Sequence, residues 1–184
     1  MTIHPCDSNT LPSRDVATLR RTLLAWFRRH HRTLPWRKLR PQKPNPYHVL
    51  VSEAMLQQTQ VTTVVGYFRR FIVKWPTLTL LASANSQEVL RMWQGLGYYR
   101  RAVHLHAAAQ IIVRDGRGKV PRKIEDLAKL PGIGLYSAGA IASIAHGQCV
   151  PAVDANAARV LARWFAIGTP LDQSKIRSRV WQLA

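Results

Sequence analysis

Two carboxylates stand out among the nine acidic residues of this 184-residue chain. Glu53 lies in an apolar stretch between Val51 and Met55, and Asp154 follows an apolar run that ends at Val153. A carboxyl group in an apolar pocket has a raised pKa and can act as a general acid near neutral pH. An ionised carboxylate can instead stabilise positive charge on a sugar. Two unlike carboxylates of this kind are what cleavage of a C1–N or C1–O bond through an oxocarbenium-like state requires.

Each carboxylate also has a simpler interpretation. From the helical period alone, Glu53 is placed on the exposed side of a half-buried helix. Asp154 precedes an expected helix, and aspartate is a favoured N-cap; a cap can still serve catalysis. Asn156 could orient Asp154 or a water, or could simply be a polar residue of the first helical turn.

The turn Pro131-Gly132-Ile133-Gly134 separates two expected helices. Glycine can adopt positive φ and has no Cβ, so another chain can approach such a turn closely. Backbone amides at the start of the following helix face outward and favour an anion. In a chain this basic, the simplest anion is a nucleic-acid phosphate, although glycine turns also punctuate ordinary helical proteins.

Polar amides and aromatic side chains follow two of the expected helices. Gln57, Gln58 and Gln60 carry donors and acceptors that can replace base-pair hydrogen bonds or fill the gap left by a displaced base. Tyr98 and Tyr99, in a glycine-rich turn before two arginines, could wedge between bases or stack on them. The alternative is helix capping by the glutamines and core packing by the tyrosines.

Composition favours a polyanionic partner. Lys and Arg number 27 against nine acids, a formal net charge of +18, while 47% hydrophobic residues allow a substantial core. Cys6 and Cys149 have neither a disulfide framework nor metal-ligand spacing, which indicates a reducing compartment. Cys149, beside Val150, is predicted to be a small core residue. The N-terminus lacks a secretory signal, and no apolar stretch is long enough to span a membrane.

The hydrophobic pattern predicts an all-α fold with nine or ten helices, no strand and no repeat. Asn45 and Pro46 are expected to start one helix as N-cap and first helical residue, and Ser86 or Asn85 to cap another. Residues 115–118 are expected to form a loop. The expected helices span 15–31, 47–59, 61–75, 88–94, 98–114, 124–130, a segment from Tyr136, 154–167 and a segment from Ser174.

Taken together, these features resemble the helix-hairpin-helix DNA glycosylases, specifically the MutY-type adenine DNA glycosylases, from about Trp26 to Ala184. Several specific blocks occur in order: Leu34-Pro35-Trp36-Arg37, Val51-Ser52-Glu53-Ala54-Met55-Leu56-Gln57-Gln58-Thr59-Gln60-Val61, Gly95-Leu96-Gly97-Tyr98-Tyr99, Leu130-Pro131-Gly132-Ile133-Gly134-Leu135-Tyr136-Ser137-Ala138-Gly139 and Val153-Asp154-Ala155-Asn156.

The resemblance implies base excision repair of adenine mispaired with 8-oxoguanine or guanine. It implies that Glu53 protonates the flipped adenine, that Asp154 stabilises the oxocarbenium-like sugar, and that Asn156 positions Asp154 or the water. Tyr136 stands where the related endonuclease III type has a lysine nucleophile, which favours simple hydrolysis over Schiff-base strand cleavage.

The same resemblance implies a DNA interface. Gln58 and Tyr98 would enter the base stack opposite the flipped base, with Gln57 beside them. Gly132, Ile133 and Gly134 would form the hairpin that grips phosphate, often with a monovalent cation at its carbonyls. Arg32 and Trp36 would line the adenine pocket.

Departures from the family pattern concern the C-terminal part. The family binds a [4Fe–4S] cluster, whose four cysteines would lie beyond residue 184, and Cys6 and Cys149 do not match them. The separate domain with which the family reads 8-oxoguanine would likewise lie beyond residue 184, and Ala155 stands where the family pattern has a glycine. The expected organisation is a frayed tail (1–14), an N-terminal helix and linker belonging to a second helical domain (15–44), a six-helix barrel (45–150) with its hairpin at 124–146, and a truncated C-terminal helical domain (151–184).

The sequence therefore predicts a monomeric, intracellular, monofunctional adenine DNA glycosylase that acts on double-stranded DNA and has no metal ligands within this chain. Two alternatives stay open. One is a pyrimidine-lesion glycosylase and lyase of the endonuclease III type. The other is a non-catalytic helix-hairpin-helix remnant that only binds DNA.

Overall fold

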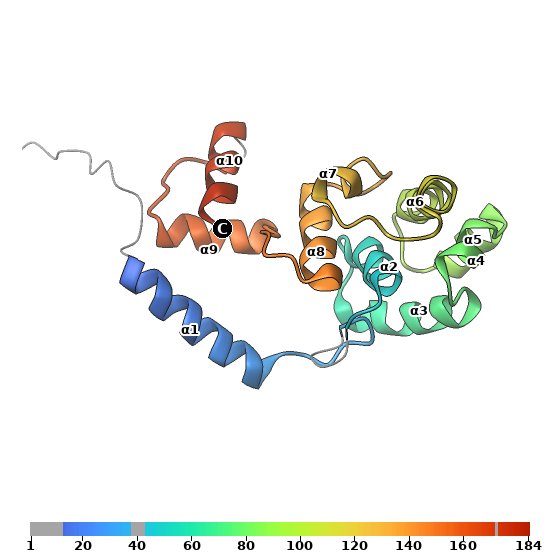
Figure 1. The fold of residues 1–184 in the computed structure, drawn as a ribbon, viewed down its shortest axis with the longest axis horizontal. Coiled ribbons are helices and arrows are strands. Elements are labelled where there is room, and N and C mark those ends of the chain that lie inside the picture. The colour runs from blue at the N-terminus through green and yellow to red at the C-terminus, as the bar shows by residue number, and fades with distance from the viewer. Residues whose placement is uncertain (1–12, 38–42, 172) are drawn as a thin grey trace, which may run out of the picture. The chain divides into compact units, whose positions relative to one another are not determined.

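The computed structural model describes residues 13–37, 43–171 and 173–184, and these residues form ten α-helices and no β-strand (Figure 1). The predicted all-α class is confirmed. Cys6 and nearly all of the expected tail lie outside the described residues. The helices are α1 (Ser13–His30), α2 (Pro46–Leu56), α3 (Val61–Lys74), α4 (Leu78–Ala82), α5 (Ser86–Trp93), α6 (Arg100–Gly116), α7 (Ile124–Leu127), α8 (Leu135–His146), α9 (Ala155–Trp164) and α10 (Ser174–Leu183).

The chain divides into two compact units. One comprises residues 34–152 and contains α2 to α8; the other combines residues 1–33 with 153–184 and contains α1, α9 and α10. No described helix is both long enough and apolar enough to cross a membrane.

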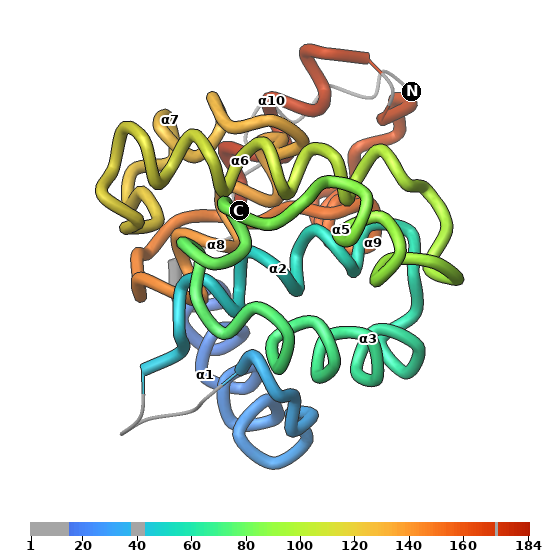
Figure 2. The backbone as a smooth tube through the Cα atoms, turned by 90° about the vertical axis from the view of Figure 1, so that its right-hand side faces the viewer, coloured from blue at the N-terminus to red at the C-terminus, as the bar shows by residue number. Residues whose placement is uncertain are grey.

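Helix α2 is the centre of the first unit. It contacts α3, α6 and α8, and Figure 2 shows it between α3 and α6. Its residues are apolar nearly all round, as expected for a helix enclosed by its neighbours. Asn45 begins it as predicted, because its side-chain oxygen accepts a hydrogen bond of 2.9 Å from the Tyr47 amide. The interpretation of Glu53 as a solvent-exposed residue is wrong: only 4% of it is exposed.

Aromatic side chains fill the space around α3. Phe71 meets Trp75 and Trp93 edge-on, with ring centroids 4.8 and 6.2 Å apart. Trp36, which precedes α2, meets Phe68 in the same way at 5.0 Å. Because edge-to-face aromatic pairs add to the favourable free energy of burial, this cluster stabilises the packing around α3.

Several local predictions need correction. Helix α4 was not expected, because five residues are too few to show a helical period; Thr77 caps it by accepting a bond from the Leu80 amide. The expected loop at 115–118 begins later, since α6 continues through Gly116. Cys149 is exposed and is not a core residue, because it lies in the irregular segment after α8.

The second unit has little core of its own. Its buried apolar residues among those described are Val153 and Val180, and α9 contacts α10. Helix α9 ends at Trp164, three residues before the predicted end, and Ala166 beyond it has a left-handed backbone (φ 48°). Leu23, Leu24 and Trp26 of α1 are about half exposed.

Candidate active site and nucleic-acid interface

Glu53 occupies the third turn of α2, with buried residues on both sides of it. Burial raises the pKa of its carboxyl from 4.5 to about 7, and the positive charge of Arg37 opposes this rise only in part. A carboxyl group with this pKa is half protonated near neutral pH, so it can donate a proton to a substrate there.

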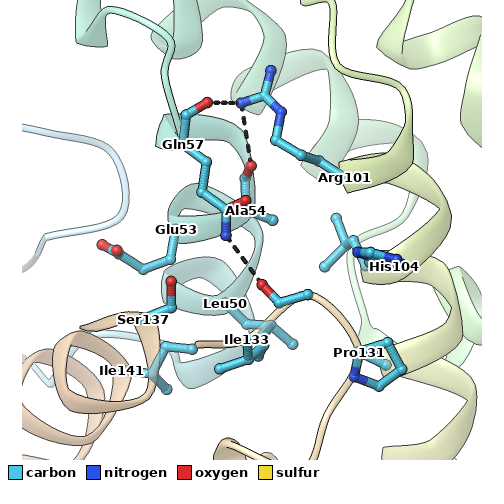
Figure 3. A pocket seen from close by; sticks show the side chains of 13 residues that line it. Leu50, Glu53, Ala54, Gln57, Arg101, His104, Pro131, Ile133, Ser137 and Ile141 are labelled. Carbon is cyan, nitrogen blue, oxygen red and sulfur yellow. Dashed lines mark hydrogen bonds between the residues drawn. The ribbon is translucent and has the colours of Figure 1, made fainter. Parts of the chain in front are cut away.

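A small pocket lies between α2, α6, α8 and the turn that precedes α8 (Figure 3). Glu53 of α2 and Gln57, which directly follows α2, border it on one side, and Ser137 borders it from α8. The Gln57 amide crosses to the turn and donates a hydrogen bond of 3.2 Å to the Gly132 carbonyl. The cavity volume, about 20 Å³, suits one water molecule and not a purine base.

The 131–134 turn joins α7 to α8 as predicted, and its two glycines have different roles. Gly132 has φ +73°, and a Cβ built there would lie 2.7 Å from the Cβ of His104 on α6. The turn therefore packs directly on α6. Gly134 is the N-cap of α8 with an extended backbone and no side-chain cap, which leaves the first-turn amides of α8 available to an anion.

We expect Gly132→Ala to lower the free energy of unfolding by about 1–3 kcal/mol, because alanine would be strained at positive φ and would press on His104. Chemical denaturation measures the change. Gly134→Ala is the matched control, since its φ is −83° and nothing lies within 4 Å of the added Cβ. Equal destabilisation by the two changes would contradict the proposed packing of the turn on α6.

Two further segments carry the predicted base-contacting residues. Gln57 and Gln58 follow α2, and Tyr98 precedes α6. Gln58 and Tyr98 both have left-handed backbones, at φ 59° and 48°, which is uncommon for residues other than glycine. Tyr98 is 63% exposed, so its ring is accessible to a partner.

Asp154 and Asn156 belong to the second unit. Asp154 is the N-cap of α9, as predicted, and its Oδ1 accepts a bond of 2.7 Å from the Ala157 amide. It also lines a cavity with Arg177 and Trp181. The Asn156 side-chain oxygen accepts a bond of 3.1 Å from Arg159.

The remaining predicted site residues, Tyr136, Arg32 and Trp36, differ in how far they are exposed to solvent. Tyr136 is in the first turn of α8 and is 39% exposed. Arg32 is exposed after the end of α1, whereas Trp36 is 1% exposed and is not among the residues that line the Glu53 pocket. The assignment of Arg32 and Trp36 to an adenine pocket stays a prediction.

Sequence reasoning assigned no role to three residues that surround this site: Arg37, His104 and Arg101. Arg101 is the most informative of them, because it is buried although it is charged. Its spacing from Leu105, Ala108 and Ile112 follows the helical period, so the apolar stripe of α6 was a usable signal. Only the fold could reveal that His104 packs against the turn.

The described residues do not fit an iron–sulfur cluster. Such a cluster takes four cysteine thiolates, and the whole chain has two cysteines. No group of three or more His, Cys, Asp or Glu side chains suitable for a metal occurs in the part of the chain that the structure describes.

Comparison with known proteins identifies the family. Residues 51–184 match the family described as HhH-GPD superfamily base excision DNA repair protein. This match covers most of the chain, and the chain therefore belongs to that superfamily. A solved structure of a thermostable thymine-DNA glycosylase has the same fold, with a TM-score of 0.78 and 24% identity over 92% of this chain and 78% of that chain.

Relatives in sequence are more specific. The adenine DNA glycosylase of Rattus norvegicus is 49% identical over 175 residues, which are 92% of this chain and 34% of the relative. That of Mycobacterium tuberculosis (strain H37Rv) is 48% identical over 141 residues, 77% of this chain and 45% of the relative. The chain thus spans between a third and a half of the length of these relatives.

Proposed function

We propose that this chain is an adenine DNA glycosylase of base excision repair, which removes adenine mispaired with 8-oxoguanine or guanine from double-stranded DNA. The observation that carries the proposal is the buried carboxyl of Glu53, whose pKa of about 7 makes it a proton donor near neutral pH. The identity to adenine DNA glycosylases supports adenine as the base.

In the proposed reaction, Glu53 donates its proton to a ring nitrogen of the flipped adenine. The electron pair of the C1′–N9 bond then leaves with the base, and the sugar becomes oxocarbenium-like. The ionised Asp154 stabilises this positive charge, and Asn156 positions Asp154 or the attacking water. Water adds its oxygen to C1′ and releases a proton, so that the products are free adenine and an abasic site.

Tyr136 supports a hydrolytic and not a lyase mechanism. A glycosylase that also cleaves the strand forms a Schiff base through an amine, and the phenol of Tyr136 cannot form one. The endonuclease III type of reaction is therefore the alternative that borohydride trapping tests, because borohydride reduces a Schiff base to a stable adduct with DNA.

The deciding experiment is single-turnover release of adenine from a duplex that carries adenine opposite 8-oxoguanine. We expect free adenine, an abasic site cleaved only after alkali, and no adduct with borohydride. Intact duplex binding without release of adenine would contradict the enzyme proposal and leave a DNA-binding remnant. A trapped adduct would favour the lyase.

We further propose that Gln57, Gln58 and Tyr98 contact the bases around the flipped adenine, while the turn at Gly132, Ile133 and Gly134 contacts phosphate. The protein would act as a monomer on intracellular DNA. Because the chain has 27 basic residues and only nine acidic ones, we expect its affinity for duplex DNA to fall by about tenfold or more between about 50 and 200 mM salt. Fluorescence anisotropy measures this; an affinity independent of salt would contradict binding through phosphates.

A further inference from the structure

Arg101 is a charged residue whose side chain is almost entirely enclosed, with 8% of the residue exposed. It lies in the first turn of α6 and reaches across to the segment that follows α2 (Figure 3). There its guanidinium donates hydrogen bonds to the Met55 carbonyl at 2.8 Å, to the Gln57 carbonyl, and to the Thr59 hydroxyl at 3.0 Å. These bonds hold the end of α2 and the beginning of the Gln57–Gln60 segment.

The same guanidinium also holds the turn before α6. Its Nη2, which also bonds to Thr59, donates to the Leu96 carbonyl at 3.1 Å and to the Gly97 carbonyl at 3.2 Å. The Tyr98 ring lies 5.3 Å from the guanidinium carbon, within the range of a cation–π contact. One side chain therefore joins two segments that are about forty residues apart in sequence.

The hydrogen-bond acceptors of Arg101 are all neutral oxygens, of backbone carbonyls and of the Thr59 hydroxyl. The ion pairs found among the described residues are Lys74–Glu88, Arg114–Asp115 and Lys129–Asp126, so none of them neutralises Arg101. A buried cation without a carboxylate costs free energy, which good hydrogen bonds must offset. The planar guanidinium has five donors in a fixed fork, and lysine cannot reproduce its bonds to separate carbonyls.

Both segments have strained backbones at the residues expected to meet DNA. Gln58 and Tyr98 are two of the four residues other than glycine that have positive φ in the described part of the chain. Such conformations persist where the surroundings over-determine them. Arg101 bonds to residues on both sides of Gln58 and to the residue immediately before Tyr98.

We propose that Arg101 is a positioning residue, which sets the 57–59 and 96–98 segments in their base-contacting conformations before DNA binds. The inference rests on the proposed function, because it takes Gln58 and Tyr98 as the residues that enter the base stack. When both segments already have their base-contacting conformations, less conformational entropy is lost as adenine is separated from its paired base. Arg101 itself need not contact the substrate.

Arg101→Lys tests this proposal, with Arg100→Lys as the matched control, because Arg100 is exposed and adjacent. We expect Arg101→Lys to release adenine from a mispaired duplex about tenfold to a hundredfold more slowly. We expect it to release adenine from a single strand, where no base needs to be extruded, at close to the parent rate. Equal losses on both substrates, or no loss on either, would overturn the positioning role.

A second measurement does not depend on catalysis. Hydrogen exchange of the free protein should be faster in the 56–60 and 95–99 segments of Arg101→Lys and unchanged in α3 and α8. Unchanged exchange in both segments would overturn the inference even if adenine release failed for the parent protein. Absence of release by the parent alone would instead contradict the proposed function.

Thr59→Val provides a variant for the case in which Arg101→Lys does not fold. It removes one acceptor and leaves Arg101 and its carbonyl partners in place. We expect faster exchange confined to residues 56–60, together with slower release from the mispaired duplex than from the single strand. Parent-like exchange at 56–60 would count against Arg101 as the support of this segment.

Discussion

Glu53→Gln is expected to lower the single-turnover rate of adenine release by about 100-fold to 10,000-fold, the contribution typical of general acid catalysis. Glutamine has nearly the same shape as glutamate but cannot give a proton to the leaving base. Because the Glu53 side chain is buried, the neutral amide of glutamine should be tolerated there and the fold preserved. Glu125→Gln, the same change on an exposed residue of α7, is the control and should leave the rate unchanged.

Glu53→Gln and the parent protein also test the burial of Glu53, through the pH dependence of their free energies of unfolding. The pKa of Glu53 is about 7 in the folded state, above its ordinary value of 4.5. The stability linked to its bound proton is therefore fully present below about pH 4.5 and is lost as the pH rises to about 7. The rise from 4.5 to about 7 corresponds to about 3 kcal/mol of stability.

We therefore expect Glu53→Gln and the parent to unfold with similar free energies at acid pH, because both side chains are then neutral. Above about pH 7, the variant should be the more stable protein by up to about 3 kcal/mol. Urea unfolding at a series of pH values measures the difference. A constant difference across this range would mean that Glu53 is solvated and would remove the main support for the proposed acid.

Asp154→Asn is expected to slow adenine release by about 100-fold to 1,000-fold, as for the loss of one group that stabilises charge in a transition state. Asparagine keeps the side-chain oxygen that accepts the Ala157 amide, and it is as good an N-cap as aspartate. Stability should therefore change little, while the negative charge is lost. Undiminished release by Asp154→Asn would contradict the proposed role.

Two further variants separate the cap of α9 from the charge. Asp154→Ala removes both, so it should also lower the free energy of unfolding by about 1 kcal/mol. Asp126→Asn makes the same chemical change at an exposed site, where the carboxylate forms an ion pair with Lys129. It should leave release of adenine at the parent rate. Thermal unfolding and adenine release, measured on the same samples, distinguish the two contributions of Asp154.

Local chemistry in the sequence was sufficient to predict most helices and their starts. Asn45, Asn85 and Asp154 each accept a hydrogen bond from a backbone amide two or three residues ahead, as capping predicts. The motif blocks were sufficient to identify the superfamily. Helix α4 was not predicted, because five residues are too few to show a helical period of apolar residues.

Tertiary structure alone decided the environment of the candidate site. The period of α2 suggested that Glu53 faces solvent, but α3, α6 and α8 enclose α2 and leave its carboxyl buried. Arg101 likewise finds several of its acceptors more than forty residues away in the sequence, among them Met55 and Thr59. Capping depends on atoms a few bonds apart along the chain, whereas burial and the pKa of a carboxyl depend on which distant helices pack around it.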